Sequence, residues 1–100
     1  MTPFDAEKFE DKYKHYFTEL QQAYRNAFEE MEQRYDSDIV HYIDQHLLAE
    51  SEPFYDGNGR FRVELSNDTE RQVEDEDMSE ILEEYIQVLE EQIAAEFEFQ

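Results

Sequence analysis

The sequence predicts an α+β fold that is mostly helical: a long helix, a shorter helix, a β-hairpin and a C-terminal helix. Apolar residues recur at three- and four-residue steps over most of the chain, which is the period of one helix face. Both glycines stand in one short turn between two apolar runs, which is typical of a hairpin. One hundred residues suit a single domain, 1–100, with one modest core.

Residues from about 4 to 34 contain no glycine or proline and are predicted to form one long helix. Their apolar residues form a seam with heptad-like spacing, consisting of Tyr13, Phe17, Leu20, Tyr24, Ala27 and Met31 and widened by Phe9, Tyr16, Ala23 and Phe28. We expect most of this face to form the core. Because it is long and aromatic, we also expect part of it to remain for a second subunit. The candidate interaction residues on this helix are Tyr13, Phe17, Tyr24 and Phe28.

A shorter helix is predicted from about 37 to 50. Asp36 and Ser37 offer side-chain oxygens that can cap its N-terminus. Its buried face is expected to consist of Ile39, Val40, Ile43, Leu47 and Leu48. Pro53 ends the helical segment, because the residue before a proline avoids helical backbone angles.

The clearest local signal is the run 53–65, which predicts a β-hairpin. The turn 56–59 reads Asp-Gly-Asn-Gly, and both pairs accept positive φ angles. Beyond it, apolar Phe61, Val63 and Leu65 alternate with charged residues, which indicates one buried and one exposed strand face. A lone hairpin is marginally stable, so we expect it to lie on the helices.

Arg60 and Arg62 on the exposed face of the hairpin are two further candidate interaction residues. They are two of only three basic residues after position 34. We expect them to pair with the acidic C-terminal helix. The alternative is a patch that binds a small anion or an acidic partner.

Residues 66–76 are predicted to form a polar loop, followed by a helix from about 78 to 97. Asp77 with Glu80 three residues later matches a capping box. The apolar face of this helix is Met78, Ile81, Leu82, Tyr85, Ile86, Leu89, Ile93 and Phe97. We expect the first and last helices to pack antiparallel. That packing would bring Lys8, Lys12 and Lys14 near Glu90, Glu91 and Glu96.

The charge is strongly acidic: 28 acidic residues against eight basic ones give a formal net charge of −20. A disordered acidic tail is disfavoured, because aromatic residues make up 15% of the chain and occur throughout it. We favour adaptation to a halophilic cytoplasm, where a Debye length of about 3 Å at molar salt screens the repulsion. The alternative is mimicry of nucleic acid, with carboxylates in place of phosphates. Direct binding to nucleic acid or to an anionic membrane is disfavoured.

Candidate metal-binding patterns are incomplete. Asp38 and His41 have the spacing found in di-iron bundles, and His46 and Glu50 are separated by one helical turn. Neither pair has the further ligands that a metal site needs. Residues 75–86 fit the first positions of a calcium loop but lack its central glycine and its final glutamate. We therefore expect no metal and no cofactor.

Catalytic patterns are also absent from the sequence. The chain has no cysteine, its serines lie in predicted caps or polar loops, and two glycines are too few for a phosphate-binding loop. Asp44 follows Tyr42 and Ile43, which is the only local context apolar enough to raise a carboxyl pKa. We expect Asp44 to be an exposed helical residue and the protein not to be an enzyme.

The sequence predicts a cytoplasmic protein. Its first residues lack the basic and apolar regions of a signal peptide, and no window approaches the 18 apolar residues of a membrane span. The leading functional hypothesis is a non-enzymatic interaction module that self-associates through the aromatic seam. Its partner is expected to be a second copy, as in a homodimer, or another protein. The alternative is an acidic decoy that binds a basic protein surface through the C-terminal helix.

Two stretches carry a resemblance to known proteins. They read Phe4-Asp5-Ala6-Glu7-Lys8-Phe9-Glu10-Asp11-Lys12-Tyr13 and Glu50-Ser51-Glu52-Pro53-Phe54-Tyr55, the second continuing to Leu65. They resemble a family of short acidic haloarchaeal proteins known only as a domain of unknown function. The resemblance covers roughly residues 4–65 and supports the halophilic interpretation. It implies no catalytic residue, cofactor or partner.

Overall fold

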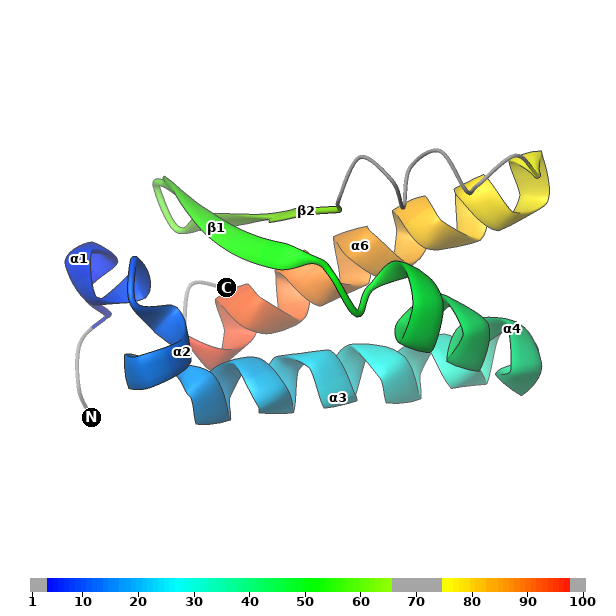
Figure 1. Ribbon diagram of the computed structural model, residues 1–100, viewed down its shortest axis with the longest axis horizontal. Helices are drawn as coiled ribbons and strands as arrows, with labels where there is room; N and C mark the ends of the chain where they lie inside the picture. The colour runs from blue at the N-terminus through cyan, green and yellow to red at the C-terminus, as the bar shows by residue number, and fades with distance from the viewer. Residues whose placement is uncertain (1–3, 66–74, 98–100) are drawn as a thin grey trace.

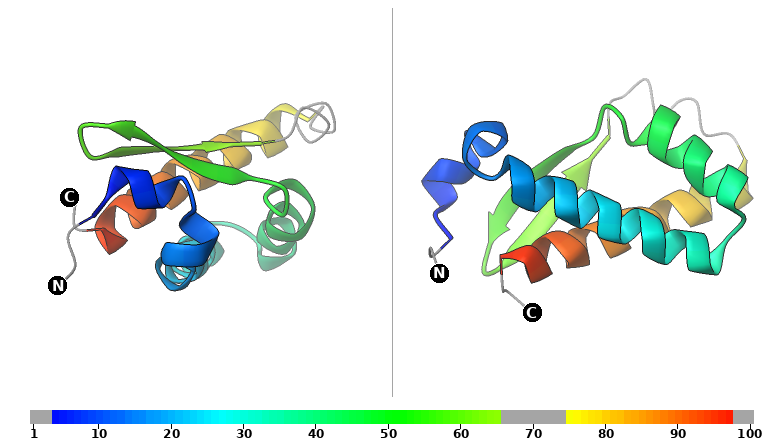
Figure 2. Two further views of the ribbon diagram at one scale, coloured as in Figure 1. Left: turned by 60° about the vertical axis from the view of Figure 1, so that its left-hand side comes forward. Right: turned by 90° about the horizontal axis from the view of Figure 1, so that it is seen from below.

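The computed structural model describes residues 4–65 and 75–97, so most of the predicted polar loop lies outside the described residues. Two long helices, α3 (Phe17–Arg34) and α6 (Glu76–Glu96), run antiparallel along the long axis of the molecule (Figure 1). An antiparallel pair of strands, β1 (Glu52–Gly57) and β2 (Arg60–Glu64), lies against the side of α6 that faces away from α3 (Figures 1 and 2). The predicted α+β, mostly helical fold is confirmed.

The single long helix predicted over about 4–34 is wrong in its first half. Two short helices, α1 (Ala6–Phe9) and α2 (Lys12–His15), precede α3. The backbone leaves helical geometry at Asp11, with φ −107° and ψ 44°, and at Tyr16, with φ −127° and ψ 22°. The Asp5 amide donates a hydrogen bond to the Tyr16 hydroxyl, 3.0 Å away, which holds the folded-back segment in place.

Aromatic packing explains these interruptions. They turn the N-terminal segment so that Phe9 and Tyr16 are only 3% and 8% exposed. Phe9 lies 5.3 Å from Phe61, and Tyr16 lies 4.9 Å from Phe97, between ring centroids. Burying one such side chain contributes about 1.5–3 kcal/mol, whereas a net helical hydrogen bond contributes about 1 kcal/mol. Tertiary burial therefore outweighs helix continuity in a segment without glycine or proline.

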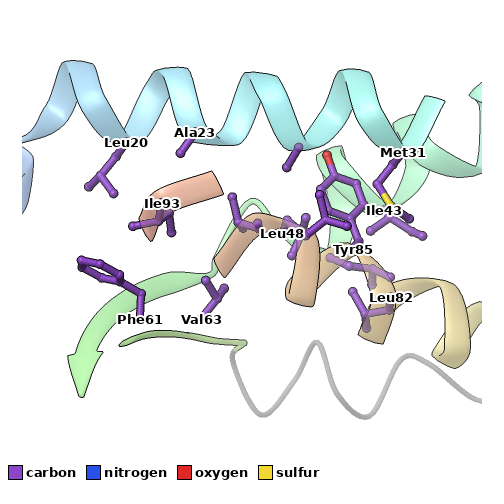
Figure 3. Close-up of a cluster of buried hydrophobic side chains, with 14 of the residues drawn as sticks. Leu20, Ala23, Met31, Ile43, Leu48, Phe61, Val63, Leu82, Tyr85 and Ile93 are labelled. Atoms are coloured by element: carbon purple, nitrogen blue, oxygen red, sulfur yellow. The ribbon is translucent and has the colours of Figure 1, made fainter. Parts of the chain in front are cut away.

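The core lies where α6 is enclosed between α3 and the hairpin (Figure 3). Ala23 and Ala27 of α3 are fully buried, and their small side chains let α6 approach closely. The larger buried side chains from α3, α6 and β2 are Leu20, Met31, Leu82, Tyr85, Val88, Leu89, Ile93, Phe61 and Val63. Most of the apolar seam predicted on the first long helix thus forms the core, as expected.

The predicted shorter helix consists of α4 (Ser37–Tyr42) and a π-helical turn, η1 (Ile43–Leu47). Asp36 caps α4 as predicted, accepting a hydrogen bond of 2.8 Å from the amide of Asp38. The Leu48 amide donates to the Ile43 carbonyl, 2.9 Å away, which is the wider π spacing. Such turns are rare and are found frequently at functional sites.

The hairpin forms as predicted. Gly57, Asn58 and Gly59 all have positive φ angles, of 91°, 57° and 76°. Phe61 and Val63 are buried, and the alternating residues of β2 are exposed. The Tyr55 hydroxyl accepts a hydrogen bond of 3.1 Å from the Gly59 amide, which fastens the turn to its own strand.

Helix α6 begins slightly earlier than predicted. Its N-cap is Asp75, which accepts a hydrogen bond of 2.9 Å from the amide of Asp77, so the capping box expected at Asp77 and Glu80 is wrong. Both aspartates are suitable caps, and sequence alone did not distinguish them. The helix ends at Glu96, which places Phe97 beside the hairpin and the N-terminal segment.

Candidate functional site: an aromatic groove beside α3

A groove of about 360 Å³ lies between the first half of α3 and the segment that follows η1. Its lining residues are Tyr13, Phe17, Leu20, Gln21, Tyr24, Asp44, Leu48, Ala49 and Ser51. We call this site the aromatic groove. The volume falls within the range of about 300–1,000 Å³ that is typical of binding pockets. Among its lining residues, only Asp44 carries a formal charge.

Two large aromatic side chains form the exposed rim of the aromatic groove. Tyr13 is 57% exposed and Phe17 is 51% exposed. The non-helical backbone at Tyr16 causes this exposure, because it turns the Tyr16 ring inward and leaves its two aromatic neighbours outside. Two of the predicted interaction residues therefore lie together on the surface, beside an apolar hollow.

The other two predicted aromatic residues lie deeper in the structure. Tyr24 lines the groove, and its hydroxyl lies 3.0 Å from the Ser51 hydroxyl oxygen. Ser51 in turn donates to the Leu48 carbonyl, 2.6 Å away, so the Tyr24 hydroxyl is the donor to Ser51. Burial raises the pKa of Tyr24 above its ordinary value. Phe28 lies outside the groove and packs edge-on against His41, with 4.8 Å between centroids.

Asp44 is the residue that sequence analysis assigned wrongly. Instead of being exposed, it is half-buried in the π-helical turn and lines the groove. Removal from water raises the pKa of the Asp44 carboxyl, although His41 and the Tyr85 hydroxyl each favour its charged form. A carboxyl whose pKa is raised by desolvation in a hollow is a candidate functional group. The sequence does contain a local signal for this burial, because the apolar residues Tyr42 and Ile43 directly precede Asp44.

The Tyr85 hydroxyl lies next to this carboxyl inside the core. Tyr85 is 1% exposed, and its hydroxyl points from α6 toward α3 (Figure 3). No hydrogen bond of ordinary geometry reaches this hydroxyl from the described residues, although the Asp44 carboxylate is near enough to interact with it. Burial, followed by the charge of Asp44, raises the pKa of Tyr85, so the phenol is neutral at physiological pH. Asp44 thus joins the groove, which it lines, to a buried polar group of the core.

A second hollow, of about 470 Å³, lies where α1 and α2 meet the hairpin. Lys12 lines this hollow and is only 4% exposed, although a lysine side chain is seldom buried. The Lys12 ammonium forms an ion pair of 2.8 Å with Glu52. The rings of Phe9, Tyr13 and Phe54 surround it, with centroids 5.5, 5.3 and 5.1 Å from the ammonium nitrogen. The ion-pair partner of Lys12 therefore lies on β1, whereas glutamates of the C-terminal helix were expected to lie near it.

The two arginines of the hairpin are exposed, as predicted. Arg62 forms ion pairs with Asp56 at 3.2 Å and with Glu64 at 3.1 Å, both within the hairpin. Its guanidinium also lies over the Phe54 ring, 5.3 Å from the centroid. These direct ion pairs lie within the hairpin and not with the C-terminal helix, although the charge of Arg62 also acts on Glu90 of α6. Arg60 lies beside the turn and does not line the aromatic groove.

The histidine pairs discussed as metal sites have other neighbours. His41 lies 3.8 Å from the Glu32 carboxylate and contacts Phe28. His46 stacks on Tyr42, with ring centroids 4.8 Å apart. Over residues 4–65 and 75–97, no group of three or more histidine, aspartate or glutamate side chains has the arrangement of a metal site.

Glu90 of α6 is half-buried beside the hairpin. Its carboxylate accepts a hydrogen bond of 2.9 Å from the amide of Val63 on β2. This bond joins the outer edge of the hairpin to α6. Burial raises the pKa of Glu90, although the Val63 amide and Arg62 favour its charged form.

We expect Glu90→Gln to remove the pH dependence that Glu90 gives to stability while keeping an acceptor for Val63. Because the folded-state pKa is raised, stability is greatest below the unfolded-state pKa and is lost as pH rises through the folded-state pKa. Urea unfolding at acidic and neutral pH checks this. The free energy of unfolding of Glu90→Gln should exceed that of the native protein only at neutral pH. Glu90→Ala, which removes the hydrogen-bond acceptor, should lower the free energy of unfolding by about 1–2 kcal/mol. If Glu90→Gln is destabilised as much as Glu90→Ala, the role assigned to the Glu90 carboxylate as acceptor for the Val63 amide is contradicted.

Comparison with known proteins gives a family and no activity. The chain matches the family of unknown function DUF5783 over residues 1–100, and it therefore belongs to that family. The match extends beyond residues 4–65, where the sequence resemblance was seen, into the C-terminal helix. No curated protein and no solved structure matches the chain. In the part of the chain that the structure describes, no helix has both the length and the hydrophobicity needed to cross a bilayer.

Proposed function

We propose, from the premise that this family carries no assigned activity, that the protein is a non-enzymatic interaction module that self-associates through the aromatic groove. The observation that supports the proposal is the pair of half-exposed aromatic side chains, Tyr13 and Phe17, beside an apolar hollow. Exposed aromatic residues next to a concave apolar surface are typical of sites that bind other proteins.

Charge distribution favours a second copy of the chain as the partner. Charged residues make up 36% of the sequence, yet only Asp44 among the groove residues is charged. Two molecules of net charge −20 repel each other, and the repulsion is weakest where their contacting surfaces carry few acids. An interface with a two-fold axis uses the same patch on both subunits, so one charge-poor patch per molecule suffices.

We infer that the working environment is a cytoplasm at molar salt. Of the 28 acidic residues, those on α6 alone number eight, and α6 has no basic residue. At about 1 M salt the Debye length is about 3 Å, so repulsion between such surfaces is largely screened. Salt also strengthens the burial of apolar surface in many cases, which favours association through aromatic groups.

Sedimentation velocity in about 2 M KCl, where the Debye length is below about 3 Å, tests the proposal. We expect the native protein to form a dimer. Phe17→Gln and Tyr13→Gln should each weaken it about tenfold or more, which corresponds to about 1.4 kcal/mol of lost apolar burial. Tyr42→Gln is the matched control, because Tyr42 is 44% exposed and lies outside the groove. A single-chain mass at every protein concentration, or an equal effect of Tyr42→Gln, would overturn the proposal.

An acidic decoy is the second candidate function. It is supported by the eight acidic residues of α6, of which five are exposed: Glu76, Asp77, Glu80, Glu83 and Glu91. Two other glutamates of this helix are engaged within the molecule, Glu84 with Arg34 and Glu90 with the β2 backbone. A decoy needs ordered rows of free carboxylates, so these contacts favour the interaction module.

A further inference from the structure

One side of α3 carries two hollows of opposite character on either side of Gln21. The α3 residues that line the aromatic groove are Phe17, Leu20, Gln21 and Tyr24. A second, polar hollow of about 340 Å³ is lined by Thr18, Gln21, Gln22 and Arg25, so the two hollows extend side by side over the same turns of α3. Gln21 lines both hollows. Gln21 and Arg25 are both exposed, so this side of α3 faces away from the core.

Two-fold symmetry would bring these hollows together. Phe17, Gln21 and Arg25 stand at four-residue steps, which places them on one helix face about 6 Å apart. If a second copy of α3 crosses antiparallel at Gln21, positions equally far from Gln21 lie opposite each other. Arg25 of the second copy then lies over Phe17, at the mouth of the aromatic groove, and the symmetric contact repeats on the other side.

The charges at these positions are complementary. The Arg25 side chain is 74% exposed, and its ion pair with Glu29, at 3.4 Å, joins two exposed side chains and is therefore weak. Asp44 is the one formal charge in the groove and lies half-buried. An arginine stacks on aromatic rings and binds a carboxylate at the same time. The aromatic rim and the acidic base of the groove together suit a guanidinium group.

We propose that the aromatic groove is a guanidinium site, which receives Arg25 from a second copy of the chain lying antiparallel along α3. The guanidinium stacks on Phe17 and Tyr13 and pairs with Asp44. This inference rests on the proposed self-association and adds its orientation and its central contact. It also explains why a protein with so many acids keeps a single carboxylate in an otherwise uncharged groove.

The pH dependence of dimerisation distinguishes a cationic occupant from an apolar one. The groups that face Asp44 are His41 of α4, Tyr85 of α6 and, across the groove, Tyr24 of α3. In the free protein, burial raises the Asp44 pKa. A guanidinium lowers that pKa, so dimerisation releases protons and strengthens as pH rises through the raised value. An apolar occupant raises the pKa further, so dimerisation would weaken as pH rises.

A double-mutant cycle in the full chain tests the contact. We expect Arg25→Gln and Asp44→Asn each to weaken the dimer about tenfold, and the double variant to be no weaker than either single one. Lys8→Gln and Asp38→Asn are matched controls, because both side chains are exposed and lie outside the groove. Dimer affinity should rise with pH in the native protein and lose this dependence in Asp44→Asn.

The outcomes separate the inference from the proposed function. A native protein that is monomeric overturns both. A dimer that is weakened by Phe17→Gln, but in which Arg25→Gln and Asp44→Asn act additively or not at all, leaves self-association intact and overturns the guanidinium site. The guanidinium site is also overturned if the dimer affinity of the native protein falls as pH rises and that of Asp44→Asn does not. That result would indicate an apolar occupant of the groove.

Discussion

Lowering KCl from about 3 M to about 0.1 M is expected to unfold the chain, with loss of most helical circular dichroism and of the dimer. Over this range the Debye length grows from below about 3 Å to about 10 Å, so carboxylates on neighbouring turns begin to repel one another. Helix α6 is the most affected, because its eight acidic residues have no basic neighbour on the same helix. It also packs against both α3 and the hairpin, so its loss removes the core.

Far-UV circular dichroism and light-scattering mass across the KCl series check this result. NaCl at equal ionic strength is the control, because screening depends on ionic strength and not on the cation. A fold that is intact at about 0.1 M KCl contradicts the prediction. In that case the charge of −20 needs another purpose, and the acidic decoy becomes the better proposal.

Lys12→Ala is expected to destabilise the protein by about 2 kcal/mol. Removing one partner of a fully buried ion pair costs about 3–5 kcal/mol, and the value is smaller here because the side chain of Glu52 is 48% exposed. The variant also loses the contacts of the Lys12 ammonium with the Phe9 and Phe54 rings. The loss should loosen α2 from β1, since Lys12 joins the two across 40 positions of sequence.

Urea unfolding at fixed high salt measures the effect, with Lys12→Met as the matched control. Methionine keeps an apolar stem of similar length without the charge, so it should recover the part of the loss that comes from packing. Lys14→Ala controls for a change of net charge, because Lys14 is exposed on the same short helix. A Lys12→Ala variant as stable as the native protein would contradict the role assigned to this residue.

Local signals explain which elements the sequence predicted well. The Asp-Gly-Asn-Gly turn at 56–59 specifies its own positive φ angles, so the hairpin needed no tertiary information. The apolar period of α6 is long enough to identify the helix, although it misplaced the cap by two residues. Tyr13 and Phe17 were selected as interaction residues from their type and spacing, and both lie in the aromatic groove.

Long-range contacts explain what the sequence could not predict. The break before α3 depends on Phe9 and Tyr16 meeting aromatic rings from the hairpin and from the end of α6. No local residue marks that break. Likewise, Asp44 is half-buried because the chain places it near Tyr85 on α6, and Lys12 is paired by a residue 40 positions away. Partners from distant elements decide burial and charge at these positions.

The order of the elements along the chain has a consequence for synthesis. Helix α6 is the last element of the fold, yet α3 and the hairpin bury their apolar faces mainly on it. A nascent chain that has not yet made α6 therefore exposes Leu20, Met31, Phe61 and Val63 without their partners. Folding must wait for the end of translation of this domain, and the waiting chain is open to aggregation or to chaperone binding. Its first, strongly aromatic half is the part that needs such protection.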